Sequence, residues 1–183
     1  MNGSRQGYFV GAGAGTTYTV RLGSSGSTAT TIQNLAINTS GSGVIAGAAG
    51  NVTIGNVGDT GLLTLNAANS VGAQGGGTLT VNNPINLNAF TMTFRGGDVV
   101  INGNISGTVS GTALNVSSGA FGLTTGTLTL GGNNTYSGLT TVGPSTLKIA
   151  GGSAIPDGST VSLQNNAAVF DVQAPGWRHA DSQ

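Results

Sequence analysis

The chain has 183 residues, with five Lys or Arg, five acidic residues, a formal net charge of zero, one His and no Cys. The lack of a basic excess argues against nucleic-acid binding, and the lack of Cys excludes a disulfide framework and a Cys/His metal cluster. No run of about 18 apolar residues occurs, so the sequence predicts no transmembrane helix.

Short apolar bursts recur along the chain, and most of them read apolar–polar–apolar. This alternation places both apolar side chains on one face of a strand. Clusters of Gly, Asn and Pro separate the bursts at residues 75–77, 82–84, 131–134 and 156–158, and such clusters are typical of turns. The sequence therefore predicts strands and almost no helix. The bursts lie at residues 35–37, 52–54, 63–65, 79–81, 92–94, 99–101, 114–116, 128–130, 147–149, 161–163 and 170–172.

The spacing of these bursts indicates a stacked array, because one unit recurs at steps of 14 to 20 residues after Leu65. A β-sandwich also has regularly spaced strands. However, strands with only two apolar side chains cannot hold a sandwich core, whereas strands stacked in register form continuous ladders. The predicted fold is all-β, a right-handed parallel β-solenoid (β-helix) with Gly and Asn at the corners.

The sequence suggests three parts. Residues 1–15 form a poorly defined N-terminal segment, residues 16–172 the solenoid, and residues 173–183 a disordered tail in which Trp, His and charged residues arrive together. The first residues show no signal-peptide pattern, and no series of barrel strands closes the sequence. We therefore expect the chain to be a fragment, a truncated reading frame or one excised part of a larger passenger.

One motif is specific, and it spans residues 126–149, GTLTLGGNNTYSGLTTVGPSTLKI. This segment resembles the autotransporter-associated β-strand repeat, also called the passenger-associated transport repeat, of bacterial surface proteins. Ser145 and Leu139 stand where that family commonly has Gly. The resemblance implies a β-helical passenger region that is exported across the outer membrane and displayed at the cell surface. The matching positions are Gly126, Thr127, Leu128, Leu130, Gly132, Asn134, Thr135, Tyr136, Gly138, Thr140, Val142, Thr146, Leu147 and Ile149.

Each motif residue has an expected structural role. Leu128, Leu130, Leu147 and Ile149 should stack in the core of adjacent coils. An Asn at position 134 should cap backbone groups inside a turn. A Tyr at position 136 should lie against the coil with its hydroxyl towards solvent.

Candidate catalytic residues are few and scattered. Asp59, Asp98 and Asp157 each lie beside Gly, which favours turn positions over a carboxylate pair. His179, the only His, lies in the tail and supports no Ser–His–Asp arrangement. The glycines at 11–15 lack the Lys of a phosphate loop. We predict no catalytic residue, no cofactor-binding residue and no metal ligand, and hence no enzyme.

Two further patterns have ordinary explanations. Asn-x-Ser/Thr sequons at residues 38, 51, 104, 115 and 133 are about as frequent as this composition gives by chance. Thr pairs at 78/80, 91/93 and 127/129 resemble the ladders that bind ice in some antifreeze proteins. Three unevenly spaced pairs favour ordinary solvent-facing Thr.

The expected function is structural: a passenger or stalk segment of a secreted or surface-displayed bacterial autotransporter-like protein, such as an adhesin. The alternative is a β-helix that binds or cleaves carbohydrate, although one Trp and three Tyr supply little surface for sugar stacking. Expected partners are the rest of a larger passenger and translocator protein, and host or matrix surfaces. With ten charges and no capping helix, the chain should also self-associate end to end.

Overall fold

The structure is a computed structural model, and its described part consists of strands and their connections. No helix occurs in this part, so none of the described residues forms a helix that could cross a membrane. Of the described residues, those from 51 onward also have described side chains, except at positions 74 and 75. The described residues are 7–10, 18–22, 30–32, 35–39, 43–47, 51–56, 61–117, 125–151 and 153–172.

The strands stack in three faces, and within each face every recorded pairing is parallel. The first face contains β1 (Gly7–Val10), β4 (Leu35–Thr39), β7 (Leu63–Leu65), β9 (Ile85–Asn86) and β11 (Ile105–Ser106). The second contains β2 (Tyr18–Leu22), β5 (Gly43–Gly47), the first halves of β8 (Asn69–Val81) and β10 (Met92–Ile101), then β12 (Thr108–Val116), β14 (Ser137–Val142) and β16 (Val161–Leu163). The third contains β3 (Thr30–Ile32), β6 (Val52–Ile54), the second halves of β8 and β10, then β13 (Thr127–Leu130), β15 (Thr146–Ile149) and β17 (Val169–Val172).

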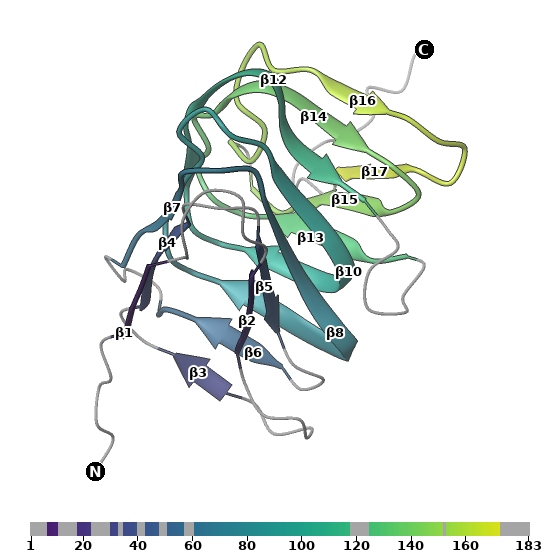
Figure 1. The fold of residues 1–183 in the computed structure, drawn as a ribbon. Coiled ribbons are helices and arrows are strands. Elements are labelled where there is room, and N and C mark those ends of the chain that lie inside the picture. Colours follow the sequence, from purple (N-terminus) through teal and green to yellow (C-terminus); the bar gives the residue numbers. More distant parts are fainter. Residues whose placement is uncertain are drawn as a thin grey trace, which may run out of the picture.

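From β1 to β13 the chain visits the three faces in turn and then begins again, so it winds as a solenoid; after β13 its strands alternate between the second and third faces. In Figure 1 the turns are stacked between β3 at one end and β16 and β17 at the other. This arrangement confirms the predicted parallel β-solenoid. Long-range parallel pairing of this kind needs crossovers, and each coil provides them through its corners.

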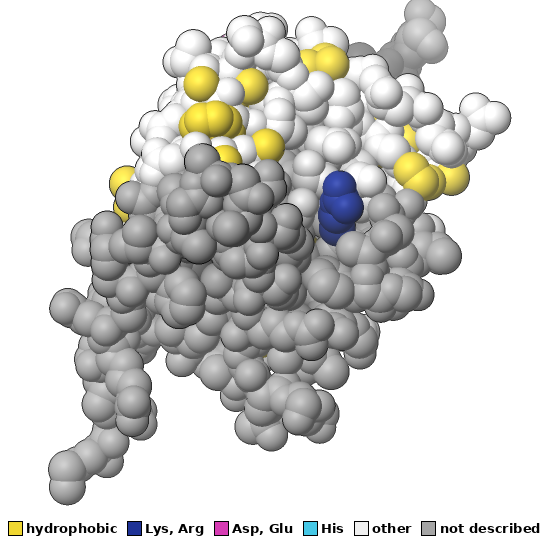
Figure 2. All heavy atoms as spheres, viewed as in Figure 1, with side chains coloured by type: hydrophobic (Ala, Val, Ile, Leu, Met, Phe, Trp, Pro, Cys, Tyr) yellow, Lys and Arg dark blue, Asp and Glu magenta, His cyan; other side chains and the backbone are white. Residues whose placement is uncertain are grey.

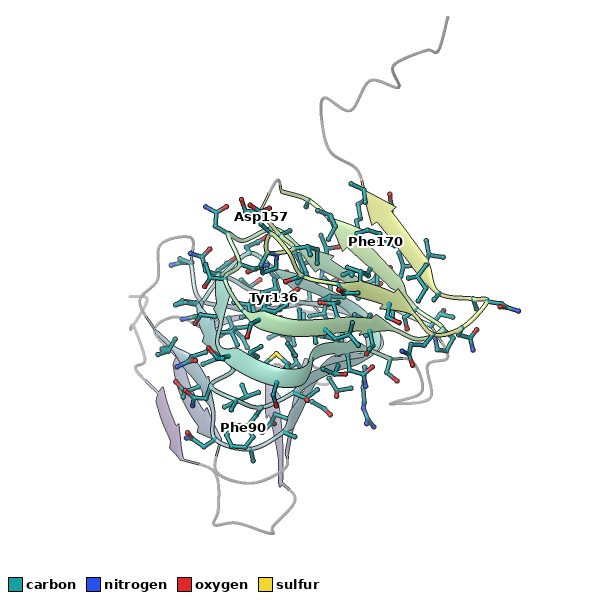
Figure 3. The ribbon with its side chains drawn as sticks, turned by 90° about the horizontal axis from the view of Figure 1, so that it is seen from above. Phe90, Tyr136, Asp157 and Phe170 are labelled. Carbon is teal, nitrogen blue, oxygen red and sulfur yellow. The ribbon has the colours of Figure 1, made fainter. Side chains whose placement is uncertain are left out.

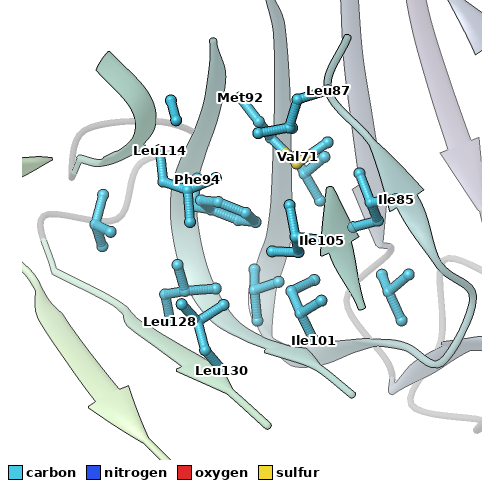
Figure 4. Close-up of a cluster of buried hydrophobic side chains, with 14 of the residues drawn as sticks. Val71, Ile85, Leu87, Met92, Phe94, Ile101, Ile105, Leu114, Leu128 and Leu130 are labelled. Atoms are coloured by element: carbon cyan, nitrogen blue, oxygen red, sulfur yellow. The ribbon is translucent and has the colours of Figure 1, made fainter. Parts of the chain in front are cut away.

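The core is a set of ladders formed by the inward residues of successive coils. On the third face, Leu79, Val99, Leu128 and Leu147 occupy one register, and all of them are buried. Figure 4 shows how such side chains from different coils meet along the axis. The predicted inward positions of the triplets from 52–54 to 147–149 are thereby confirmed.

The corner between the second and third faces differs from the prediction. The Gly cluster at 75–77 is not a turn between strands, because β8 continues through it and pairs with β5 before it and with β6 after it. In the next coil β10 does the same, with a register shift between Gly96 and Asp98. Gly76 and Gly96 both have φ of +81°, so these glycines bend the chain inside a continuous strand.

The next corner is a compact stack of Asn and Gly. The side-chain amide of Asn102 donates to Asn82 Oδ1 at 2.8 Å, and that of Asn82 donates to the Gly55 carbonyl at 2.8 Å. A Cβ at Gly103 would lie 1.9 Å from the carbonyl oxygen of Asn83. The backbones of successive coils approach so closely here that this position requires Gly.

Candidate functional site

The motif at residues 126–149 is the candidate functional site, and Asn134 lies at its centre. This side chain is buried, and its Nδ2 donates to the carbonyl of Ala154 at 2.6 Å. Its Oδ1 accepts the N–H of Ile105 at 2.7 Å. The amide therefore bridges the preceding and following coils in the way a peptide group does, which confirms the predicted capping of backbone groups.

Tyr136 contradicts the expectation that its hydroxyl faces solvent. The side chain is 1% exposed, and its hydroxyl lies 2.9 Å from the hydroxyl of Thr140, itself buried. Burial raises the pKa of Tyr136, while the hydrogen bond with Thr140 acts in the opposite direction with the smaller effect. Figure 3 shows Tyr136 inside the coil. The prediction was wrong because a buried Thr four residues later satisfies the phenol without water.

The signal that could have located Tyr136 lies in its spacing from Asn134. Side chains that are two positions apart on an extended chain point to the same side. Asn134 lies next to Ile105, which belongs to the inward set. An inward Asn at position 134 thus implies an inward Tyr at position 136. The expectation of a solvent-facing hydroxyl used only the amphipathic character of Tyr, which does not indicate the side of the strand to which the ring points.

The remaining motif residues act in stacking. Leu128, Leu130, Leu147 and Ile149 are all buried, as predicted. At Gly126 a Cβ would lie 1.9 Å from the carbonyl oxygen of Gly96 in the preceding coil. The motif's Gly positions therefore serve close coil packing, and its Leu and Ile positions build the core.

The Asp candidates do not gather at one site. Asp98 lies within β10 rather than in the predicted turn, and its Oδ1 accepts the N–H of Thr127 at 3.1 Å. Two coils earlier, Asn51 Oδ1 accepts the N–H of Thr78 at 3.0 Å in the same way. These acceptors tie neighbouring coils together. Asp157 lies in an exposed turn, as predicted.

Several candidates fall outside the described residues. They are Asp59, the glycines at 11–15, His179 and the tail 173–183. Among the residues that the structure does describe, no group of three or more His, Cys, Asp or Glu side chains could hold a metal ion.

The outward Thr residues do not form a continuous ladder. Along the third face, the register that contains Thr53, Thr80 and Thr129 also contains Val100 and Lys148. The face shown in Figure 2 carries mostly uncharged polar and backbone atoms where it is described. Interruption by an apolar and a charged side chain does not favour the flat, regular Thr array of an ice-binding surface.

One open cleft lies beside the motif and was not expected from the sequence. It has a volume of about 490 Å³ and lies between residues 135–139 of one coil and residues 156–160 of the next. Hydroxyl-bearing residues line both sides, and Asp157 is the one carboxylate among the described lining residues. The turn at 156–158 was predicted, but its distance from β14 could not be inferred from sequence. Figure 3 shows Asp157 at the margin of the coil that contains Tyr136.

The lining of the cleft is largely polar, but the chemistry that it offers is limited. Glycoside hydrolysis uses two carboxyl groups on either side of the bond that is cleaved, and this lining supplies one. Tyr136, although it lines the cleft, is buried and offers no exposed ring for stacking on a sugar. Comparison of the chain with protein-family models, with curated proteins and with solved structures finds no match.

Proposed function

We propose that the chain is a structural segment, a passenger or stalk β-helix of a bacterial autotransporter-like protein displayed at the cell surface. Its role is to hold other parts of that protein, such as an adhesive region, away from the membrane. The β-solenoid itself is established by the parallel pairing. The autotransporter origin and the surface location rest on the resemblance of residues 126–149.

One observation carries this proposal: the buried side chains of the motif, among them Asn134 and Tyr136, bond and pack within the stack of coils. The side-chain amide of Asn134 donates one hydrogen bond and accepts another, and both partners lie in neighbouring coils. Tyr136 directs its hydroxyl to Thr140 in the core. A motif of this kind preserves the shape of a rod, which is what a stalk needs.

The proposal is tested by locating the protein in cells that carry its gene. Antibodies raised against the chain should label intact cells, and external protease should remove the labelled protein while a cytoplasmic marker persists. Retention of the protein in the cytoplasm, protected from protease until the cells are lysed, would contradict the proposal. The adjoining reading frame gives a second test, because a passenger should be followed by a translocator domain.

Carbohydrate binding is a second candidate, favoured by the cleft between residues 135–139 and 156–160. Hydroxyl groups and one carboxylate suit the hydroxyls of a sugar, and a volume of about 490 Å³ is in the range of small-molecule sites. Binding of neutral oligosaccharides by the chain, measured by calorimetry, would support this candidate. Asp157→Asn should then weaken binding, and the matched control Asp171→Asn, on β17, should not.

A further inference from the structure

The last coil ends in an apolar surface that the described part of the chain leaves uncovered. We name it the C-terminal rung, and it consists of β16 and β17. Four of the five exposed large hydrophobic side chains in the described residues lie on it: Leu163, Val169, Phe170 and Val172. Of these, Leu163 is 53% exposed and Phe170 38%. Figure 3 shows Phe170 on the outermost strand.

Three of these side chains occupy the same ladder positions as core residues of earlier coils, but they are exposed rather than buried. Leu163 pairs with buried Val142, Phe170 with buried Leu147, and Val172 with Ile149. Each thus continues an inward ladder by one step. A parallel strand pair laid on β16 and β17 would cover them just as each coil covers the one before it.

The opposite end of the stack has strands that fit this position. In the described part of the chain, β2 and β3 pair on one side only, with β5 and β6 respectively. Figure 1 places β3 and β17 at opposite ends of the rod, so the two unpaired edges face in opposite directions along its axis. One copy can therefore be added to another by the same translation that relates successive coils.

We propose that the C-terminal rung binds the first coil of a second copy of this chain, head to tail, in the register that the solenoid already uses. Continuing the recorded ladders places Leu163 against Val20 and Val172 against Ile32 of the second copy. Asp171 then lies against Thr31, so no like charges meet. The contact is heterologous and does not close, so it builds filaments rather than a dimer.

The chemistry of the chain favours this occupant. The net charge is zero, so two copies experience little long-range repulsion. Short strands rich in Thr, Val and Leu also pair readily along open edges, and the two edges carry one charged residue each, Asp171 on β17 and Arg21 on β2. This inference is independent of the proposed surface role, because it depends only on the ladders and the exposed rung.

Engineered cysteines test the register directly, since the chain contains no Cys. Ser162 on β16 and Thr19 on β2 belong to one ladder, with strands β5, β8, β10, β12 and β14 between them. Neighbouring strands lie about 4.8 Å apart, which a disulfide can span. A chain with both Ser162→Cys and Thr19→Cys should therefore give a series of disulfide-linked multimers on oxidation, which disappears on reduction.

The matched control moves one cysteine to the middle of the same ladder. Thr93 on β10 already has strands on both sides, so Ser162→Cys with Thr93→Cys should give no such series. Equal multimer series from both variants would show non-specific aggregation and overturn the proposed register. Leu163→Asp should independently weaken association by roughly tenfold or more, seen by sedimentation over a dilution series.

Other occupants give different results. Trp177 is the only Trp, and it lies in the tail that follows β17 in sequence. If the tail covered the rung, Trp177 emission would be blue-shifted at every concentration and the chain would sediment as a monomer. A concentration-independent monomer, with or without that blue shift, overturns the proposal.

Discussion

Asn134 Oδ1 lies 2.7 Å from the backbone nitrogen of Ile105, a residue 29 positions earlier in the chain. On its other side, Asn134 Nδ2 reaches the carbonyl of Ala154. A side chain thus takes the place of a strand at the point where the first face has none: β11, the last strand of that face, ends at Ser106. Past β11 this amide joins the coils together with backbone bonds such as that from the Thr135 N–H to the Ile105 carbonyl at 2.9 Å.

Replacing Asn134 by Ala should destabilise the fold by about 2–4 kcal/mol, because it leaves a buried N–H and a buried carbonyl without partners. The adjacent Asn133 is exposed and uses its own backbone N–H, bonded to Asn104 Oδ1. Asn133→Ala is therefore the control, with an expected change within about 0.5 kcal/mol. Denaturant unfolding measures both, and equal losses would show that the bridge of Asn134 carries no special stability.

The contrast between Leu130 and Thr129 tests the inward–outward alternation. Leu130 is fully buried, so Leu130→Asp should destabilise by several kcal/mol, on the order of 4, through an unpaired buried charge and a lost core side chain. Thr129 points outward and pairs in register with Lys148, so Thr129→Asp should change stability by less than about 1 kcal/mol. Similar unfolding midpoints for the two variants would contradict the assignment of faces.

The core could be predicted from the sequence because its signal is local. An apolar–polar–apolar triplet specifies which two side chains point inward, and Leu128 with Leu130 shows that the rule holds. Triplets 161–163 and 170–172 carry the same pattern, yet Leu163, Phe170 and Val172 are exposed, because burial also needs a following coil. A triplet determines which of its side chains point inward. Whether those side chains are buried depends on a neighbouring coil, formed by residues far away in the sequence or by another chain.

The corners and the cleft could not be predicted in the same way. The sequence around Asp98 contains two glycines and reads as a turn, but a strand can absorb such a bend when its neighbour shifts register. The cleft beside Asp157 depends on where the turn at 156–158 leaves β14, which is a relation between coils. Gly and other turn residues in the sequence indicate where the chain bends. The stacking of the coils determines whether a bend interrupts a strand or opens a cleft.

The buried phenol of Tyr136 predicts a loss of stability at alkaline pH. Burial raises the pKa of Tyr136 in the folded chain above its ordinary value, 10.0. The proton is therefore held more tightly in the folded state, and the stabilisation is fully present below the ordinary pKa. As the pH rises above it, the unfolded chain loses this proton first, and the folded state loses stability.

Comparison with Tyr136→Phe isolates this contribution. The difference in unfolding free energy between the two proteins should be constant from about pH 8 to about pH 9 and should shrink as the pH approaches about 11. Denaturant melts at each pH provide the measurement. A difference that stays constant throughout would mean that the Tyr136 hydroxyl ionises as readily in the folded chain as in the unfolded one.

Two glycines with opposite surroundings test how closely the coils approach. At Gly103 a Cβ would lie 1.9 Å from the carbonyl oxygen of Asn83 and 3.0 Å from that of Asn82, both of them backbone atoms. Gly103→Ala must therefore push two coils apart at the corner, and we expect a loss of about 3 kcal/mol or more.

At Gly111 a Cβ would meet nothing within 4 Å. Gly111→Ala also reduces the freedom of the unfolded chain, so it should be neutral or stabilising by up to about 1 kcal/mol. Thermal unfolding of the two variants provides the comparison, and tolerance of Ala at position 103 would show that the Asn–Gly corner is looser than its backbone contacts indicate.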